Sequence, residues 1–184
     1  MAGADPSFTE VHLVRTLFLL GRKRQGRKKL VKLLGVGEGS VRTIIKRLSG
    51  DGLISSSMRG HELTGAGQER LKGLLNRFSG PVGVETDVVD GSKALLVVYG
   101  AAGRLGSGVN ERDTAVKAGA TGALVMYYSG GELVFPSTGG ELDAFKDSLQ
   151  VPEADEGDVI VLSFACDLQR ACDGAVAIAL RLTS

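Results

Sequence analysis

Residues 30–54 read LVKLLGVGEGSVRTIIKRLSGDGLI, and this stretch decides the fold of the N-terminal part of the chain. Apolar residues recur in it with helical spacing on both sides of a glycine-rich turn at residues 35–37. The first run predicts a short helix over about residues 25–34, and the second predicts a helix over about residues 38–48. Four apolar residues of the second helix form one stripe that is expected to be buried: Val41, Ile44, Ile45 and Leu48.

The segments on either side of this stretch extend the pattern. Thr9 is a suitable N-cap for a first helix, whose inward side carries Val11, Val14, Leu17, Phe18 and Leu20. After the helical pair, two short strands at Leu53–Met58 and His61–Leu63 predict a hairpin with its tip at Arg59-Gly60. A fourth helix is expected over about Ala66–Phe78, with an inward side made of Leu71, Leu74 and Leu75.

The order helix, helix–turn–helix, hairpin, helix resembles the winged helix-turn-helix domain of many prokaryotic transcription regulators. The resemblance covers about Thr9–Phe78 and rests on the apolar spacing, the turn and the residues Asp51-Gly52-Leu53-Ile54 that lead into the hairpin. It implies that the third helix enters the major groove of duplex DNA. The third helix starts with Gly37-Glu38-Gly39, whereas such domains often have polar side chains there that cap the helix or reach bases. Glu38 would face phosphates or a cytosine amino group.

The charges of this part support DNA as the partner independently of the resemblance. Candidate base readers lie on the outer side of the third helix, candidate phosphate contacts lie at the start of the second, and one arginine lies at the hairpin tip. The candidate base readers are Arg42, Thr43, Lys46 and Arg47. The candidate phosphate contacts are Arg27, Lys28 and Lys29, and the arginine at the hairpin tip is Arg59. The alternative is that the same residues are solvated cations of a domain that contacts protein or RNA.

The near-neutral net charge of +1 hides a division of the chain. Residues 1–80 hold 15 lysines and arginines against 6 aspartates and glutamates, a net charge of +9, whereas residues 81–184 have a net charge of −8. We therefore expect a basic domain over 1–80 and an acidic domain over 81–184, divided at Pro81. No apolar run is long enough to span a bilayer, and two cysteines make no disulfide framework, so we expect a cytoplasmic protein with no membrane partner.

The acidic part alternates strands and helices, which predicts a compact mixed α/β sandwich and, with the basic part, an α+β protein. Val82–Val89 is a candidate edge strand, and the run 94–99 is a candidate core strand that leads into a glycine-rich loop, Gly100–Gly108. Further along, Asn110 is expected to cap a helix over 111–118, and strands are expected at Thr121–Tyr128, Glu132–Phe135 and Asp158–Ala165. Gly140–Leu149 reads as an amphipathic helix and Ala175–Leu182 as a final strand, with a helix as the alternative that its alanine content allows. Two or three helices are expected to cover this mixed sheet.

Two short motifs in this part resemble those of an archaeal domain family of unknown function, DUF4443. They are Gly119-Ala120-Thr121 and Asp173-Gly174-Ala175, within a match of about Val82–Leu182. Members of that family typically carry a winged helix before the domain. The family has no established activity, so the resemblance implies a fold and no mechanism.

The Gly100–Gly108 loop is the best candidate for a ligand site, because a glycine-rich turn before a helix presents N–H groups to an anion. We expect a small anionic metabolite there, contacted by Gly103, Arg104, Ser107, Asn110 and Arg112. The competing interpretation is a turn-rich loop that binds nothing. The two histidines and two cysteines form no catalytic or metal-binding pattern, so we predict no catalytic residues, no metal and no cofactor.

These patterns together predict a DNA-binding transcription regulator whose C-terminal domain senses a small molecule or forms a homodimer. An enzyme with an accessory winged helix, active at the Gly100–Gly108 loop, and a transcription adaptor that contacts protein are the alternatives.

Overall fold

The computed structural model describes residues 8–136 and 154–184, which form an α+β protein as predicted. The chain divides into two compact units, Met1–Leu74 and Leu75–Ser184. The expected boundary at Pro81 lies a few residues further along the chain. The segment before Pro81 goes with the second unit because it pairs with a strand there: Phe78 is fully buried, and the Ser79 N–H donates to the Val97 carbonyl at 2.8 Å.

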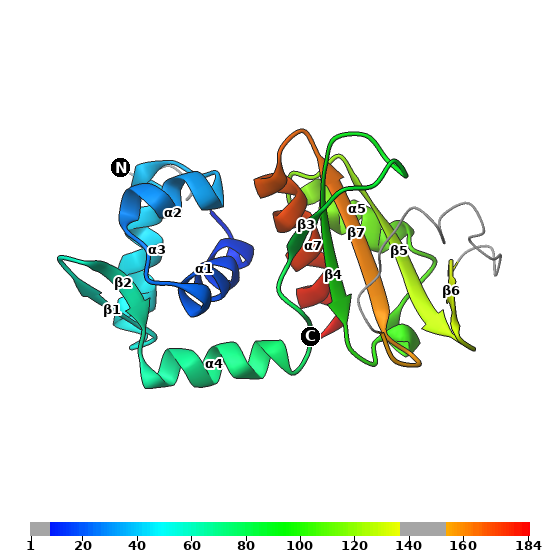
Figure 1. Ribbon diagram of the computed structural model, residues 1–184, viewed down its shortest axis with the longest axis horizontal. Helices are drawn as coiled ribbons and strands as arrows, with labels where there is room; N and C mark the ends of the chain where they lie inside the picture. The colour runs from blue at the N-terminus through cyan, green and yellow to red at the C-terminus, as the bar shows by residue number, and fades with distance from the viewer. Residues whose placement is uncertain (1–7, 137–153) are drawn as a thin grey trace, which may run out of the picture. The chain divides into compact units, whose positions relative to one another are not determined.

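The first unit contains helices and one antiparallel hairpin (Figure 1). Its elements are α1 (Glu10–Arg22), α2 (Arg27–Leu34), α3 (Glu38–Gly50), β1 (Ile54–Ser57), β2 (Gly60–Leu63) and α4 (Gly65–Leu75), the last of which continues one residue into the second unit.

The predicted apolar stripes form the core of the first unit. Val41 and Ile44 are completely buried and Leu48 is 3% exposed, while Ile45 is half-buried at the edge of the stripe. The five apolar residues expected on the inward side of α1 are all buried, and Thr9 occupies its N-cap. Leu75 was expected to face inward but is 43% exposed, because it stands at the last residue of α4, where the unit ends.

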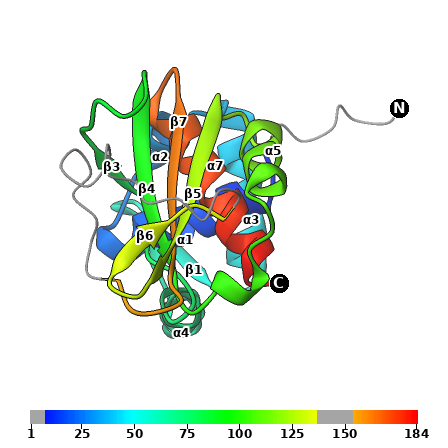
Figure 2. The ribbon, with the colours of Figure 1, turned by 90° about the vertical axis from the view of Figure 1, so that its right-hand side faces the viewer.

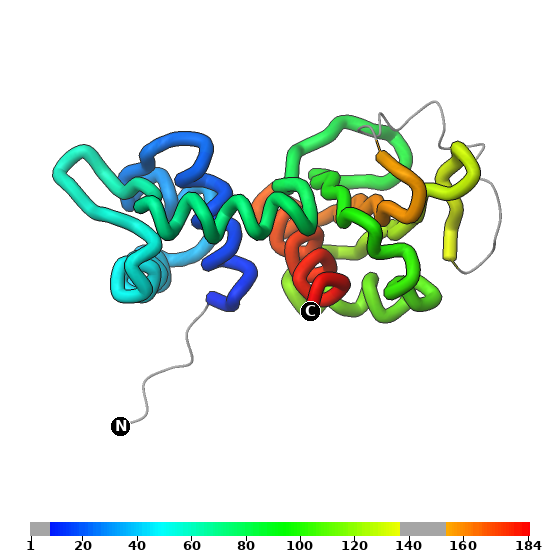
Figure 3. Tube along the Cα trace, turned by 90° about the horizontal axis from the view of Figure 1, so that it is seen from below, coloured from blue at the N-terminus to red at the C-terminus, as the bar shows by residue number. Residues whose placement is uncertain are grey.

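The β1–β2 hairpin (Figures 1 and 3) contacts the segment between α1 and α2 through the residues that follow its turn. Gln25 and His61 exchange two backbone hydrogen bonds of 3.1 and 2.9 Å. Gly60 has a φ of +119°, and a Cβ atom there would lie 2.8 Å from the Gln25 carbonyl oxygen. Only glycine fits that close approach, so the hairpin is held right beside its tip, where Met58 and Arg59 remain exposed.

The second unit is built on a five-stranded sheet in the order β3-β4-β7-β5-β6 (Figure 2). The strands are β3 (Val82–Val84), β4 (Ser92–Val98), β5 (Gly122–Ser129), β6 (Glu132–Val134) and β7 (Val159–Ala165). Every pair among these described strands is antiparallel, so the expectation of a mixed sheet was wrong. The two edge strands of the sheet, β3 and β6, are short.

Two helices, α5 (Val109–Lys117) and α7 (Leu168–Leu182), pack together on one face of this sheet, as Figure 2 shows. The opposite face has a buried cluster in which cross-strand partners meet: Leu95 with Leu162, and Met126 with Ile160. A single-turn 3₁₀ helix, η1 (Ala102–Arg104), follows β4 in the glycine-rich loop.

The C-terminal segment corrects one prediction, because Ala175–Leu182 is helical and not a strand. The Asp167 carboxylate accepts a hydrogen bond of 2.8 Å from the Arg170 N–H, so the helix is capped eight residues earlier than the apolar run begins. Ala171, Ala175, Ile178 and Leu182 then face the sheet with helical spacing, a pattern that the continuous apolar run had hidden. The helix predicted at Gly140–Leu149 lies outside the described residues.

The helix after the glycine-rich loop begins differently from the prediction. Gly108, in the left-handed conformation, is the N-cap of α5, and Asn110 lies inside the first turn. Within the described residues, no helix is long and apolar enough to cross a membrane.

Candidate functional site

The outer side of α3 carries the residues predicted to read bases. Arg42, Thr43, Lys46 and Arg47 are all exposed, opposite the buried stripe. The Thr43 hydroxyl donates to the Gly39 carbonyl within the helix at 3.1 Å. Lys46 and Arg47 form no ion pair with any described residue, so both charges are available to a partner.

Glu38, the first residue of α3, joins this surface to the start of α2. Its carboxylate lies 3.0 Å from Arg27 Nη2 and 3.7 Å from Arg42 Nη2, and all three side chains are about half exposed or more. The two ion pairs bring Arg27 of α2 and Arg42 of α3 to one point. Exposed pairs of this kind are weak, so an incoming polyanion can replace Glu38 as the partner of either arginine.

The hairpin contributes a second exposed region to the first unit. Arg59 is exposed at its tip next to Met58, whose side chain is completely exposed. Further down the hairpin, the Ser56 hydroxyl lies 2.8 Å from His61 Nδ1, and Arg24 forms an ion pair with Glu62. Partial burial, with the nearby Arg27 charge as a second cause, lowers the pKa of His61 below its usual 6.5.

Lys28 and Lys29 complete the predicted basic set at the start of α2, and both are exposed. Helix α2 has no acidic residue in its first turn and no side-chain cap, so its first N–H groups are not occupied by a side chain of that kind. A helix N-terminus that lacks a side-chain cap and is flanked by cations favours a phosphate. The first unit therefore presents a cationic surface over α2 and α3 and a cationic hairpin tip.

The structure does not bring together the five residues predicted to bind a ligand in the second unit. Arg104 lines one pocket, whereas Ser107 and Arg112 line another that is mostly apolar and includes Phe135 and Pro136. Gly103 and Asn110 are exposed and line neither pocket. The Gly100–Gly108 loop thus borders two separate hollows, and η1 lies between Ala101 and Ser107.

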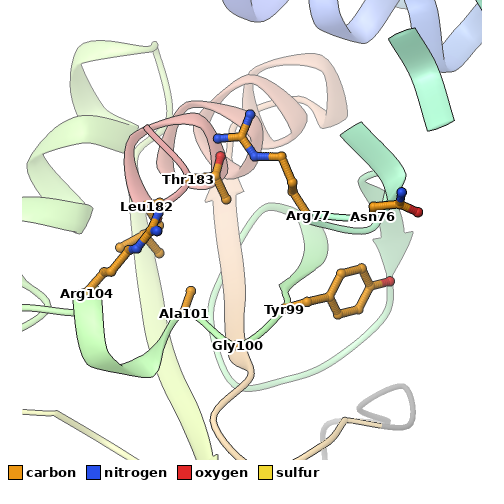
Figure 4. Close-up of a pocket in the computed structure, with 8 residues that line it drawn as sticks. All are labelled: Asn76, Arg77, Tyr99, Gly100, Ala101, Arg104, Leu182 and Thr183. Atoms are coloured by element: carbon orange, nitrogen blue, oxygen red, sulfur yellow. The ribbon is translucent and has the colours of Figure 1, made fainter. Parts of the chain in front are cut away.

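The pocket that contains Arg104 has a volume of about 210 Å³ (Figure 4). Three segments that are far apart in the sequence form it, and its walls are mainly polar. Its lining residues are Asn76, Arg77, Tyr99, Gly100, Ala101, Arg104, Leu182 and Thr183, all in the second unit.

A buried ion pair links the two helices of the second unit. Glu111 of α5 is 1% exposed, and its Oε1 accepts a hydrogen bond of 2.7 Å from Arg181 Nη1 of α7. Its other carboxylate oxygen, Oε2, has no hydrogen-bond partner in the described part of the chain. The pair stabilises the contact between α5 and α7, a role that the sequence analysis did not identify.

Comparison with known proteins identifies the family of the second unit. A model of a domain of unknown function, DUF4443, matches residues 89–182, which is half of the chain. The chain belongs to the DUF4443 family. A second model, the PH0730-like N-terminal domain, matches residues 11–69. No curated protein matches the chain.

A solved structure resembles both parts of this DUF4443 protein. It is the hypothetical protein PH0730 from Pyrococcus horikoshii OT3, with 30% sequence identity and a TM-score of 0.83. The match covers 96% of this chain and 94% of that one. The similarity therefore includes the α1–α4 unit as well as the DUF4443 domain.

The two DUF4443 motifs quoted from the sequence meet in the structure. A Cβ atom on Gly174 of α7 would lie 2.7 Å from Ala120 Cβ and would also contact the Ser163 hydroxyl oxygen of β7. Thr121 continues the first motif by donating its N–H to the Phe164 carbonyl at 2.9 Å. The motifs thus allow α7 to pack closely on the sheet, which explains their residue types by packing.

Sequence reasoning missed Arg77, Tyr99 and Thr183 as pocket residues. Each comes from a different segment of the sequence, so no local pattern joined them. By contrast, the outer residues of α3 are exposed as predicted, because a helical period places them on the side opposite the buried stripe.

Proposed function

We propose that this DUF4443 protein is a DNA-binding transcription regulator and that its first unit is a winged helix. The single observation that carries the proposal is the outer side of α3, where Arg42, Lys46 and Arg47 are exposed on the side opposite the buried Val41, Ile44 and Leu48. A helix with this division fits the major groove of B-DNA, where guanidinium and ammonium groups donate to guanine.

The surroundings of α3 support the same function. Arg27, Lys28 and Lys29 at the start of α2 are suited to hold a phosphate and so to orient α3. Arg59 at the hairpin tip would contact the backbone or the minor groove beside it. The net charge of +9 over residues 1–80 provides the long-range attraction for a polyanion.

The test is a binding measurement with the full chain against a pool of random duplexes, followed by titrations of the selected duplex at several salt concentrations. The affinity should fall steeply with salt, since each phosphate contact releases counterions. Arg112→Gln, which removes an exposed arginine of the second unit, is the matched control and should bind DNA normally. Binding that is insensitive to salt and to all substitutions on α3 would contradict the proposal and favour a protein adaptor.

For the second unit, the proposed roles are homodimerisation and sensing of a small anion. A two-fold dimer would place two α3 helices on half-sites about 34 Å apart or a multiple of that distance. Native mass spectrometry at tens of micromolar chain tests this part, and a strictly monomeric mass would contradict it. Turnover of a nucleotide by the second unit would instead favour the alternative of an enzyme with an accessory DNA-binding domain.

A further inference from the structure

We propose that the pocket beside the C-terminal end of α7 binds a small dianion through Arg77 and Arg104. The proposal deepens the sensing role of the second unit and does not depend on DNA binding. It moves the ligand away from the predicted set in the Gly100–Gly108 loop, of which it keeps only Arg104.

The first argument is the arrangement of the two arginines. Figure 4 shows the Arg77 guanidinium beside Thr183 and the Arg104 guanidinium beside Leu182, so the two charges approach the same helix end from different segments. Neither guanidinium has a carboxylate partner among the described residues. Two such cations in one pocket of an acidic domain call for two negative charges.

The second argument is that backbone hydrogen bonds hold the walls in place. The Tyr99 N–H donates to the Arg77 carbonyl at 2.9 Å, which fixes the start of the Arg77 side chain against the end of β4. The Gly100 N–H donates to Asp158 Oδ1 at 2.8 Å, and the Ala102 N–H donates to the Gly157 carbonyl at 2.9 Å. The pocket is thus preorganised before a ligand arrives, which reduces the entropy cost of binding.

The third argument is that Arg104 is fixed and still has donors to spare. Its Nη1 donates to the Leu182 carbonyl at 3.0 Å, at the negative end of the α7 dipole. A guanidinium has five N–H donors, so most of them remain for a ligand. The Thr183 hydroxyl donates to the Ala179 carbonyl at 2.7 Å, so Thr183 forms a wall of the pocket and the donors for a ligand come from the arginines.

The size of the pocket limits the ligand. A volume of about 210 Å³ is below the usual range for drug-sized molecules, so it suits inorganic phosphate or a short dicarboxylate. The Tyr99 side chain, 44% exposed, forms one side of the pocket. A small organic group attached to the anion could pack against its ring. Both ligand sources share one chemistry, a compact dianion paired with two arginines.

The experiment uses the full chain, titrated by calorimetry with inorganic phosphate and, separately, with succinate, at constant ionic strength set by chloride. One saturable site per chain is expected for at least one probe. Arg77→Gln should weaken that binding at least about tenfold, because it removes a charge-assisted contact. Arg77 makes no hydrogen bond or ion pair with its side chain among the described residues, so this variant should fold normally.

Two further variants separate this pocket from the other basic surfaces. Arg112→Gln lies in the neighbouring pocket and Lys46→Gln lies on α3, and both should bind the probe like the wild type. Amide signals of residues 99–104 should shift in NMR spectra of the wild type and not of Arg77→Gln. The proposal is overturned if neither probe shows saturable binding at a 10-fold excess over millimolar chain, or if Arg77→Gln binds as well as the wild type. Neither outcome would affect the proposal that the first unit binds DNA.

Discussion

The cationic residues of the two units have different surroundings. In the first unit, Lys46, Arg47 and Arg59 are exposed and have no ion pair among the described residues. In the second, Arg181 is paired with the buried Glu111, and Arg104 donates to the end of α7. Lys46, Arg47 and Arg59 thus face outward for a partner, whereas Arg104 and Arg181 hold α7 in place. Net charge alone does not distinguish the two roles, whereas the local partners do.

The largest effect should come from breaking the buried pair of the second unit. Arg181→Ala leaves the Glu111 carboxylate buried without its cation, and we expect a loss of about 3 kcal/mol in unfolding free energy. All three tyrosines of the chain lie in the second unit and tryptophan is absent, so tyrosine fluorescence in urea reports on that unit alone. DNA binding should be unchanged. A loss below about 1 kcal/mol would mean that the pair is only a surface contact.

The next effect concerns the contact between the two DUF4443 motifs. Gly174→Val adds a side chain where even its Cβ atom would lie only 2.7 Å from Ala120 Cβ. Overpacking of this kind costs about 1 to 3 kcal/mol of unfolding free energy. Gly103→Ala is the matched control, since a Cβ at Gly103 has no neighbour within 4 Å. Equal stability of the two variants in the tyrosine assay would show that α7 is not packed as described.

A comparable effect on binding, without one on stability, is expected on α3. Lys46→Ala should weaken the selected DNA site by about 1 to 3 kcal/mol if it reads a base. Arg27→Ala should instead weaken all sequences alike, because a phosphate contact carries no sequence information. Fluorescence anisotropy with matched and scrambled duplexes measures both. A Lys46→Ala variant that loses both DNA affinity and thermal stability would show that Lys46 has a structural role, as Arg104 and Arg181 have in the second unit.

A smaller change should follow from Glu38→Gln. The substitution removes the carboxylate that pairs with Arg27 and Arg42, so both arginines become free for phosphates. We expect DNA affinity to rise about two- to fivefold at low salt, in line with the weakness of exposed ion pairs. Weaker binding confined to one base position would instead identify Glu38 as a hydrogen-bond acceptor for cytosine.

The smallest effect should be a dependence on pH that belongs to the first unit. The pKa of His61 is lowered by burial, so between pH 6.5 and that lower value the unfolded chain binds more protons than the folded one. Stability from this residue is therefore present above pH 6.5 and is lost as the pH falls. DNA phosphates near Arg27 would favour the protonated His61 ring. The affinity for DNA should therefore increase as the pH falls over the same range.

Both histidines of the chain, His12 and His61, lie in the first unit, so their NMR titration reports on that unit alone. In the free chain, the His61 signal should titrate below 6.5, and it should titrate at higher pH in the DNA complex. His61→Gln should remove this share of the pH dependence. A titration at or above 6.5 in the free chain would contradict the burial of His61.

The difference between the units also decides what could be predicted. Contacts that define the surface of the first unit are local: the stripe of Val41, Ile44 and Leu48 follows from a period of 3.6 residues, and the position of Lys46 follows with it. The sequence alone therefore determined the α1–α4 elements, their buried sides and the exposed cations. It also determined the family of the second unit through two short motifs.

Only the tertiary structure decided how the second unit uses its residues. The run at Ala175–Leu182 is apolar at almost every position, so periodicity could not separate a strand from a buried helix, and the cap at Asp167 settled the choice. The pocket joins Arg77, Tyr99, Arg104 and Thr183, which the antiparallel pairing and the return of α7 bring together from across more than a hundred positions. Such a site depends on long-range contacts, and no local pattern in the sequence encodes which distant side chains will share a cavity.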